Sequence, residues 1–403
     1  MSKINFTKKS LTKKFQITVV GGGLTGSLMV YILLKSNIIS KNSLCWIKPE
    51  KKIIFDNRVS FYNLKNFKTL RRYGLLTKFT KKDLSYITNI EVLNELQKKP
   101  LSFHENDGLG VICKNYQIQK EILNNFNGVK IINSKVLDTE INEFERIIYL
   151  ENREIISSNL ILAADGSNSK LRELCNIKYL NVNLNHTALN GHLKINDNFN
   201  HIARQAFLKE GPIGLLPVSY KEMYINFVWS VKTEFAEKLK DDQKTINNLV
   251  NKLNLLYRKN NLIFSPIIKQ TPNHLSKIYK WPLKLVHVPK PIGKRIALIG
   301  DSAHTIHPLA GQGFNLSLED CFEILKILET SYQTGKDFGH PDHLFQYVLN
   351  RKKRTRSMTF STTSIFYTFT QNSKFLKNFL SFGMDELEKR KVKNIFKNIA
   401  SGH

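Results

Sequence analysis

The sequence predicts an α/β fold with three parts: a Rossmann-like dinucleotide-binding domain, an inserted domain built on a mixed β-sheet, and a C-terminal helical region. Three observations support this prediction. An apolar strand leads into a glycine-rich turn and an apolar helix at residues 17–34. A second strand, glycine-rich loop and helix follow at residues 295–325. Between about 178 and 285, alternating strands replace the interleaved strands and helices of the first part.

The N-terminal segment, QITVVGGGLTGSLMVYILL, has the spacing of a nucleotide-binding turn. A buried strand is predicted over residues 17–20 and an apolar helix over residues 27–34. The glycines between them follow the GxGxxG pattern: Gly21, Gly23 and Gly26. In this pattern the first glycine makes a tight turn, the second lets the backbone approach a pyrophosphate, and the third lets the helix pack on the strand.

The segment RIALIGDSAHTIHPLAGQGFNLSLED predicts a second ligand-binding turn. Asp301 lies at the end of a short apolar strand, where a carboxylate can accept hydrogen bonds from a polyol. Pro308 excludes a helix before the glycines. Gly311 and Gly313 let backbone N–H groups approach a flat ligand, and the dipole of the helix that begins at Phe314 favours negative charge there. An ordinary strand–loop–helix connection is the alternative interpretation.

A third signal lies between these two, where LILAADGSNSKLR predicts a buried strand that ends in Asp165-Gly166 and a polar turn. The three segments in this order resemble the flavoprotein aromatic hydroxylases, which have the fold of p-hydroxybenzoate hydroxylase. The run DSAHTIHPLAGQGFNLSLED narrows the resemblance to the hydroxylases of ubiquinone biosynthesis. The resemblance extends from Ile17 to the closing Ala400-Ser401-Gly402.

The resemblance implies that FAD is the cofactor. Asp56-Asn57-Arg58 stands where the family has Asp-x-Arg, and Asn115 and Gln119 match an Asn and a Gln on the helix beside the flavin. The cofactor-binding residues that it implies are Gly21, Gly23, Gly26, Arg58, Gln119, Asp165, Asp301, Gly311, Gly313 and Phe314. Pro308 and Gln312 are expected near the isoalloxazine. No catalytic side chain and no metal is assigned, because the flavin carries the chemistry.

Lys48 departs from the family pattern. After the second strand, Leu44 to Ile47, both the family and the dinucleotide fingerprint have an acidic residue that binds the ribose hydroxyls of the adenosine. Here the position holds a lysine, with Glu50 two residues further on. Glu50 or a backbone carbonyl could take the role, so the departure bears on FAD affinity and not on the fold.

The resemblance implies an FAD-dependent monooxygenase that hydroxylates the ring of a polyprenylated phenol in ubiquinone biosynthesis, through a flavin C4a-hydroperoxide. NAD(P)H or another donor supplies the electrons. The apolar residues Leu215, Leu216, Phe227 and Trp229 are candidates for the substrate tunnel, although each is also a typical core residue. Two alternatives remain: a flavin hydroxylase for a soluble aromatic acid, which needs an Arg or Lys clamp, and a non-catalytic FAD-binding or assembly subunit.

Composition limits the partners and the compartment. The chain has 61 Lys plus Arg against 33 Asp plus Glu, a net charge of +28. The basic residues are spread along the chain without a nucleic-acid-binding motif, so compositional drift is the simpler explanation, with an anionic membrane surface as the alternative. The four cysteines show no CxxC pair, which favours a reducing compartment. No run of about twenty apolar residues predicts a membrane span.

We expect a discontinuous FAD-binding domain over residues 15–177 and 285–335, a substrate domain over 178–284, and a C-terminal helical region over 336–403. In the last region a basic run, Arg351 to Arg354 with Arg356, precedes apolar residues at helical spacing, among them Phe360, Phe375 and Phe379. This face either packs on the FAD-binding domain or docks on a membrane. The expected partners are O2, a hydrophobic phenol, and candidate contacts with a membrane surface or a quinone-biosynthesis complex. The expected location is the cytoplasm, peripheral on the inner face of the membrane.

Two histidine pairs invite a metal interpretation. His304 and His307 lie in the second glycine-rich loop, and His340 and His343 repeat their spacing. A zinc site needs a third ligand, and neither loop supplies one at a metal-binding spacing. We therefore expect polar packing around the flavin loop for the first pair and a solvated loop for the second.

Overall fold

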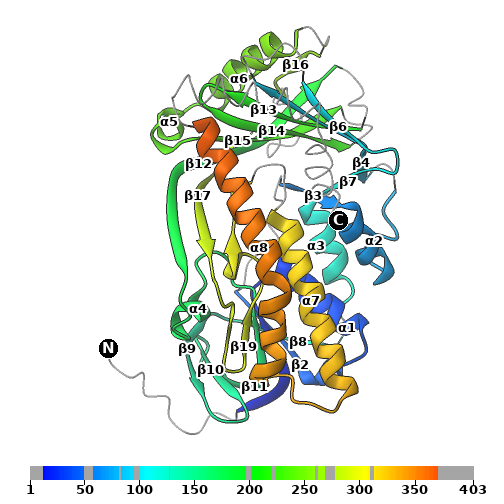
Figure 1. Cartoon of the computed structure of the whole chain (residues 1–403), viewed down its shortest axis with the longest axis vertical. Coiled ribbons are helices and arrows are strands. Elements are labelled where there is room, and N and C mark those ends of the chain that lie inside the picture. The colour runs from blue at the N-terminus through cyan, green and yellow to red at the C-terminus, as the bar shows by residue number, and fades with distance from the viewer. Residues whose placement is uncertain are drawn as a thin grey trace.

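Two large sheets lie at opposite ends of the molecule, and helix α8 runs between them (Figure 1). The structure, a computed structural model, describes residues 12–49, 58–80, 83–94, 100–126, 128–196, 201–219, 223–258, 262–267, 277–308 and 313–370. Helix α8 contacts β14 in one sheet and β18 in the other. The predicted α/β fold is confirmed.

The first sheet is the predicted dinucleotide-binding sheet. Its strands within the described residues are β1 (Lys13–Val20), β2 (Leu44–Lys48), β8 (Lys130–Asn133), β9 (Val136–Ile141), β10 (Arg146–Leu150), β11 (Ile155–Ala163), β18 (Ile292–Gly293) and β19 (Ile296–Leu298). Strand β1 pairs in parallel with β2 and β11, and β11 pairs in parallel with β19. Parallel neighbours need crossover connections, which β1 and β2 obtain from helix α1 (Leu24–Lys35).

The second sheet is mixed and contains strands from distant parts of the chain. They are β5 (Asn89–Asn94), β6 (Leu101–His104), β12 (Leu180–Ile195), β13 (Ile202–Leu208), β14 (Gly211–Ser219), β15 (Tyr224–Lys232), β16 (Phe264–Ser265), β17 (Tyr279–His287) and β20 (His304–Thr305). Strands β5 and β6 lie in the interval predicted as FAD-binding domain, yet β5 pairs in parallel with β13. The division into domains remains a prediction, and these two strands would extend the substrate region.

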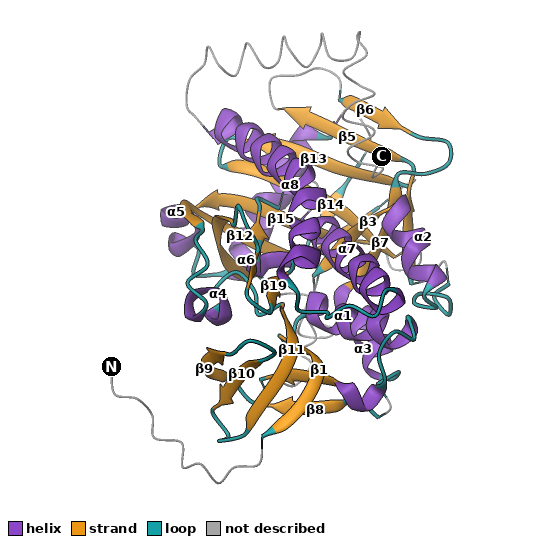
Figure 2. Cartoon of the chain, turned by 60° about the horizontal axis from the view of Figure 1, so that its bottom comes forward, coloured by secondary structure: helices purple, strands orange, loops and turns teal. Residues whose placement is uncertain are grey.

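A three-stranded sheet lies between the large ones and consists of β3 (Val59–Asn63), β4 (Leu84–Ile87) and β7 (Gly110–Lys114). The remaining helices are α2 (Leu64–Arg72), α3 (Asn115–Leu123), α4 (Lys170–Leu174), α5 (Thr233–Lys238), α6 (Asp242–Leu256), α7 (Gly313–Gln333) and α8 (Pro341–Thr370). Short 3-10 turns lie at Lys41–Ser43 and Gly300–Ser302. Helices α1 and α3 lie side by side, away from the β9–β10 hairpin (Figure 2).

Each of the two large sheets has a hydrophobic core of its own. One core packs α1, α2, α3 and α7 against the first sheet and includes Leu28, Trp46 and Leu318. Another packs α6 against the mixed sheet and includes Leu215, Phe227 and Trp229. The inner face of α8 joins the first core through Leu344, Tyr347 and Val348. This packing agrees with the interpretation of the C-terminal region as a cap on the FAD-binding domain.

Candidate functional site

One cavity of about 500 Å³ lies between the glycine-rich turns of the first sheet and the inner face of the second. Its lining residues on the side of the turns are Gly23, Leu24, Thr25, Arg58, Val59, Ser60, Phe61, Asn115, Ala164, Gly166, Ser167, Asp301, Thr305, Ile306, Pro308, Gly313, Phe314 and Ser317. Those on the side of the mixed sheet are Ile90, Ala188, Asn190, Ala203, Arg204, Gln205, Gly214, Leu216, Val228, Trp281, Pro282 and Leu283. The three segments singled out in the sequence therefore all line one cavity.

The three glycines of the first turn lie in different surroundings. Gly21 has φ +130°, and a Cβ atom there would lie 2.1 Å from the carbonyl oxygen of Ala164. A Cβ on Gly26 would lie 2.2 Å from the carbonyl oxygen of Gly21. A Cβ on Gly23 would meet nothing within 4 Å. Two of the glycines thus permit close backbone packing, whereas Gly23 leaves space open in which a ligand could approach the backbone.

Side chains behind the turn hold its carbonyl groups. The Trp46 indole N–H donates to the carbonyl of Gly21 at 2.8 Å, and the Gln119 amide donates to the carbonyl of Gly22 at 3.0 Å. Helix α1 then begins after Gly23 without a side-chain cap. The unpaired N–H groups of its first turn are suited to bind a phosphate. Gln119 thus supports the turn and is not among the cavity-lining residues.

Lys48 lies beside the same turn. A Cβ on Gly22 would be 3.0 Å from the Cβ of Lys48, so the lysine occupies the position where the fingerprint has its ribose-binding carboxylate. Its ammonium lies 5.5 Å from the centre of the Trp46 ring. Glu50, the alternative ribose ligand, lies outside the described residues.

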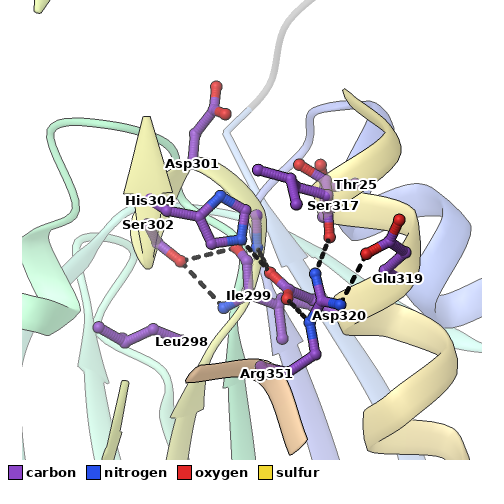
Figure 3. Close-up of polar contacts among 12 residues, drawn as sticks. Thr25, Leu298, Ile299, Asp301, Ser302, His304, Ser317, Glu319, Asp320 and Arg351 are labelled. Carbon is purple, nitrogen blue, oxygen red and sulfur yellow. Dashed lines mark hydrogen bonds and ion pairs between the residues drawn. The ribbon is translucent and has the colours of Figure 1, made fainter. Parts of the chain in front are cut away.

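Asp301 faces the cavity from a tight turn (Figure 3). Gly300 has φ +62°, and a Cβ there would lie 2.9 Å from Cγ2 of Thr25 and 3.0 Å from Oγ of Ser317. The Asp301 side chain is open to the cavity, although protein surrounds it. This enclosure raises the pKa of its carboxyl group, against the opposing effects of His304, Arg58 and Lys284. A bound polyol could restore hydrogen bonds that the carboxylate loses to burial.

Arg58 connects the two sides of the cavity. It precedes β3, and its guanidinium carbon lies 5.2 Å from the centre of the Trp281 ring on β17. Both residues line the cavity. A cation over an aromatic face is attractive, so this contact joins the turn side to the mixed sheet. Asp56 and Asn57, the first two residues of the matched motif, lie outside the described residues.

Asp165 stabilises the third turn and is not among the cavity-lining residues. Its Oδ2 accepts a hydrogen bond from the backbone N–H of Leu171 at 3.2 Å, near the start of α4. Its neighbours Ala164, Gly166 and Ser167 do line the cavity. Buried Arg172 donates to the carbonyls of Ser167 and Ser302, each at 3.0 Å, and so ties this turn to the Asp301 turn. The sequence prediction placed Asp165 on the cofactor; in the structure its Oδ2 is hydrogen-bonded within the turn, and a contact with the cofactor stays a prediction.

The final predicted residues lie at the start of α7. Pro308, Gly313 and Phe314 line the cavity, whereas Gly311 and Gln312 lie outside the described residues. Phe314 makes an edge contact with Tyr62 at a ring-centre distance of 5.3 Å. Asn315 accepts from the backbone N–H of Asn63 at 2.9 Å and thereby fixes the start of α7 to β3.

The mixed sheet supplies the other wall of the cavity. Leu216 on β14 lines it, but Leu215 lies on the opposite face, in the core under α6. Phe227 and Trp229 lie in that core too, so only Leu216 of the four predicted tunnel residues faces the cavity. This difference follows from the alternation of side chains along a strand. The cavity-lining Arg204 donates from Nε to Glu91 at 2.8 Å.

The buried carboxylate Asp320 was not predicted as a functional residue from the sequence. It lies on α7, accepts from the backbone N–H of Gly300 at 2.9 Å, and is 2.6 Å from Nε2 of His304. His304 thus takes part in the polar packing expected around the flavin loop. An acidic residue among the apolar positions of α7, between Leu318 and Cys321, was the available signal.

The other three histidines of the two pairs, His307, His340 and His343, are not among the residues that line the cavity. Burial lowers the pKa of His307 to about 3, so its imidazole is neutral at physiological pH. His343 is 2.6 Å from the hydroxyl of Ser331, and His340 is exposed beside Asp342. No group of three His, Cys, Asp or Glu side chains that could hold a metal occurs among the described residues.

The basic run of the C-terminal region is divided between two faces of α8. Arg351 is buried and pairs with Asp320 and Glu319, and Arg354 also lies near Glu319. Of the two alternatives for this face, packing against the FAD-binding domain therefore holds for Arg351, which cannot contact a membrane. Lys352, Lys353 and Arg356 are exposed. The later phenylalanines of the predicted face, including Phe375 and Phe379, lie outside the described residues.

Comparisons with known proteins agree over most of the chain. The profile of a family described as "FAD binding domain" matches residues 14–361. The curated protein "Ubiquinone biosynthesis monooxygenase COQ6, mitochondrial" of Caenorhabditis elegans is 26% identical over 447 residues, covering 98% of this chain and 97% of the relative. Among solved structures, p-nitrophenol 4-monooxygenase PnpA from Pseudomonas putida has a TM-score of 0.75 at 14% identity, covering 97% of this chain and 99% of that one. HpxO of Klebsiella pneumoniae, solved with FAD and uric acid, has a TM-score of 0.72 at 15% identity, covering 96% of each chain.

Proposed function

The chain belongs to the FAD binding domain family, and on this premise we propose that it is an FAD-dependent monooxygenase that hydroxylates the ring of a polyprenylated phenol in ubiquinone biosynthesis. The observation that carries the proposal is the shared cavity. Its one side consists of the three turns that the family uses for FAD, and its other side is a largely apolar sheet face. Cofactor and ring substrate can therefore meet in one cavity.

Specific residues fit the cofactor. The uncapped start of α1 and the open position at Gly23 suit a pyrophosphate, and Asp301 suits a ribityl or ribose hydroxyl. Arg58, Gly313 and Phe314 complete the proposed contacts from the cavity wall, with Pro308 near the isoalloxazine. When bound, FAD would take electrons from NAD(P)H or another donor and supply activated oxygen to the ring.

The chain itself orients the substrate and excludes water. Phe61, Ala203, Leu216 and Val228 give the cavity an apolar wall suited to an aromatic ring and a lipid tail. Asn190 is buried, lines the cavity, and donates to Asn226 at 2.9 Å, which fixes the orientation of its amide. A fixed amide beside the ring could accept the phenol O–H. Correct placement of the ring is the main contribution to rate that these residues can make.

The charge of Arg204 bears on the alternative of a soluble aromatic acid. Such a substrate needs a cationic clamp, and Arg204 is the arginine of the mixed sheet that lines the cavity. Because its guanidinium forms an ion pair with Glu91, the pair presents little net charge to a substrate carboxylate. This arrangement supports a neutral, hydrophobic phenol over an acid.

The alternative of a non-catalytic FAD-binding subunit rests on Lys48. The apolar wall that the mixed sheet gives the cavity supports an enzyme instead, because a subunit that only binds FAD has no need of a wall suited to a hydrophobic substrate. The first test is purification of the protein with a flavin absorbance spectrum, followed by measurement of O2-dependent electron uptake that a prenylated phenol stimulates. A colourless protein, or uptake unaffected by substrate, would support the non-catalytic alternative.

The identity of the substrate can be tested in cells. Deletion of the gene in a quinone-producing host should cause a prenylated phenol that lacks one ring hydroxyl to accumulate. The accumulated compound also identifies the ring carbon. Unchanged ubiquinone, together with loss of growth on an aromatic acid, would favour the soluble substrate.

We further propose that the enzyme approaches a membrane without crossing it, because its substrate carries a lipid tail. None of the described helices is both long and apolar enough to span a bilayer. The outer face of α8 exposes Lys352, Lys353 and Arg356 along with Phe360, which is 75% exposed. Replacing the three cations with glutamine should reduce co-sedimentation with anionic liposomes at low salt. Binding that neither the substitutions nor salt can change would contradict this proposal.

A further inference from the structure

The turn that presents Asp301 to the cavity is held from behind by a buried carboxylate. Oδ2 of Asp320 accepts from the backbone N–H of Gly300 at 2.9 Å and lies 2.6 Å from Nε2 of His304. Asp320 is fully buried and is not among the residues that line the cavity. It therefore contacts the chain on both sides of Asp301 while Asp301 itself points away from it (Figure 3).

Arg351 on α8 holds this carboxylate in turn. Its Nε donates to Oδ1 of Asp320 at 2.8 Å, its Nη1 to Glu319 at 2.7 Å, and its Nη2 to the carbonyl of Leu316 at 3.1 Å. Both oxygens of Asp320 are thus occupied by donors from different elements. Because buried networks of this kind are rigid when all their members are paired, Asp320 has little freedom to move.

Electrostatics favour an ionised Asp320. Burial by itself raises the pKa of this carboxyl, but His304, Arg351 and the Gly300 N–H outweigh that effect and hold the pKa below its usual range. Asp301 shows the opposite balance, because burial raises its pKa despite nearby cations. The charge that the structure stabilises before any ligand binds is therefore the one behind the turn, not the one facing the cavity.

The turn also has little space in which to relax. Gly300 has φ +62°, and Thr25 and Ser317 lie close to where its Cβ would be. With the N–H of Gly300 anchored on Asp320, these neighbours define one position for the next residue, Asp301. Loss of the anchor would allow the turn to shift or rotate, and the carboxylate in the cavity would shift with it.

We propose that Asp320 is a positioning residue for the cofactor: it sets the place of the Asp301 carboxylate, and Arg351 sets the place of Asp320. Helix α8 thereby contributes to cofactor binding through a residue outside the cavity lining. This inference rests on the proposed function, in which Asp301 binds FAD. Small errors in the placement of a binding group are costly, so the effect should be measurable.

A double-mutant cycle tests whether Asp320 acts through Asp301. The FAD dissociation constant is measured for the wild type, Asp301→Ala, Asp320→Asn and the double variant. Asp320→Asn should weaken FAD binding on the order of tenfold, as loss of a residue that orients a ligand commonly does. In the Asp301→Ala background it should add little, because the carboxylate that it positions is already absent. Additive effects would overturn the proposal.

The pair Arg295–Asp337 is a matched control. Arg295 is buried and donates to both oxygens of Asp337, at 3.1 and 2.6 Å, and it precedes the same strand, β19, that leads to the Asp301 turn. Asp337→Asn should lower the Tm but leave the FAD dissociation constant and the visible spectrum of the bound flavin unchanged. If Asp337→Asn weakens FAD as much as Asp320→Asn does, general destabilisation explains the result and the proposal fails.

A second pair of variants covers the case in which Asp320→Asn does not fold. Arg351→Lys keeps the charge beside Asp320, whereas Arg351→Met removes it at similar size, so FAD binding should weaken more in the methionine variant. Equal FAD affinities in the two variants would overturn the role of Arg351. Failure of the proposed FAD site can be distinguished from failure of the positioning role. Wild-type FAD affinity in Asp301→Ala would refute the proposed site. Weak FAD binding in Asp301→Ala together with normal binding in Asp320→Asn would refute only the positioning role of Asp320.

Discussion

The two walls of the cavity are built on different principles. On the side of the turns, backbone lies against backbone, and glycines such as Gly21 and Gly26 occupy places where no side chain fits. On the side of the mixed sheet, side chains of alternating residues form the surface, and Leu216 faces the cavity while Leu215 fills the core behind it. The turn side therefore depends on residue type at single positions, whereas the sheet side depends on volume and polarity and can vary with the substrate.

The largest expected effect tests the backbone packing of the turn. Gly26→Ala places a Cβ 2.2 Å from a backbone oxygen that cannot rotate away, so we expect loss of the folded, FAD-binding state. Gly23→Ala is the matched control, since its Cβ meets nothing within 4 Å. It should keep the Tm of the FAD-free protein and weaken only FAD binding. Thermal unfolding with and without FAD separates the two; equal behaviour would refute the assignment of roles.

The sheet side can be tested with two neighbouring leucines. Leu215→Ala should lower the free energy of unfolding by about 2–5 kcal/mol, because it leaves a cavity in the core under α6. Leu216→Ala should cost less stability, and it should raise KM for a hydrophobic phenol because Leu216 lines the cavity. Chemical denaturation and steady-state kinetics give the two quantities. A KM effect confined to Leu215→Ala would reverse our assignment of the two faces of β14.

Asp301→Ala tests the polar contact on the turn side. The substitution removes a hydrogen bond to a charged group, worth about 1.5–3 kcal/mol. The FAD dissociation constant should therefore rise by about tenfold or more. Fluorescence titration of the FAD-free protein with FAD measures the change. Wild-type affinity in this variant would mean that Asp301 does not bind the cofactor.

Asp301 should also affect the pH dependence of the FAD-free protein. Its pKa in the folded state is raised above the usual 3.8, so the stability linked to its protonated form is present at low pH and is lost as pH rises through the folded-state pKa. Asp301→Asn avoids this loss. The variant should therefore be slightly more stable than the wild type at neutral pH, and its advantage should disappear as pH falls toward 3.8. An advantage that does not change with pH would contradict this explanation.

The smallest expected effect concerns Lys48. A carboxylate can accept hydrogen bonds from two ribose hydroxyls, whereas an ammonium can only donate, so Lys48→Glu should tighten FAD binding by up to about 1 kcal/mol. Comparison of FAD dissociation constants gives the answer. Weaker binding in the variant would show that the lysine has a favourable role of its own at this end of the cofactor.

The difference between the walls also explains what the sequence could predict. The glycine spacing around Gly21 and the Gly300-Asp301 turn are local patterns, and the resemblance to flavin hydroxylases that they supported is confirmed by the family match. Which face of β14 is inward depends on its pairing with β13 and β15, and no short segment records that register. The inward position of Arg351 likewise depends on the packing of α8 against α7. Helix α8 begins at Pro341, outside the motif, so the motif does not record this contact.

The order of the strands has a consequence for synthesis on the ribosome. One edge of β11 is covered in two steps: β10 pairs with its first half, around Ile156, and β19 pairs with its second half, from Ile161 to Ala163. Because β19 begins only at Ile296, the apolar second half must wait while strands β12 to β17 of the mixed sheet are translated. At about 5–20 residues per second, that interval is on the order of ten seconds. The nascent chain thus carries a bare, apolar strand edge, the kind of surface that chaperones shield from aggregation.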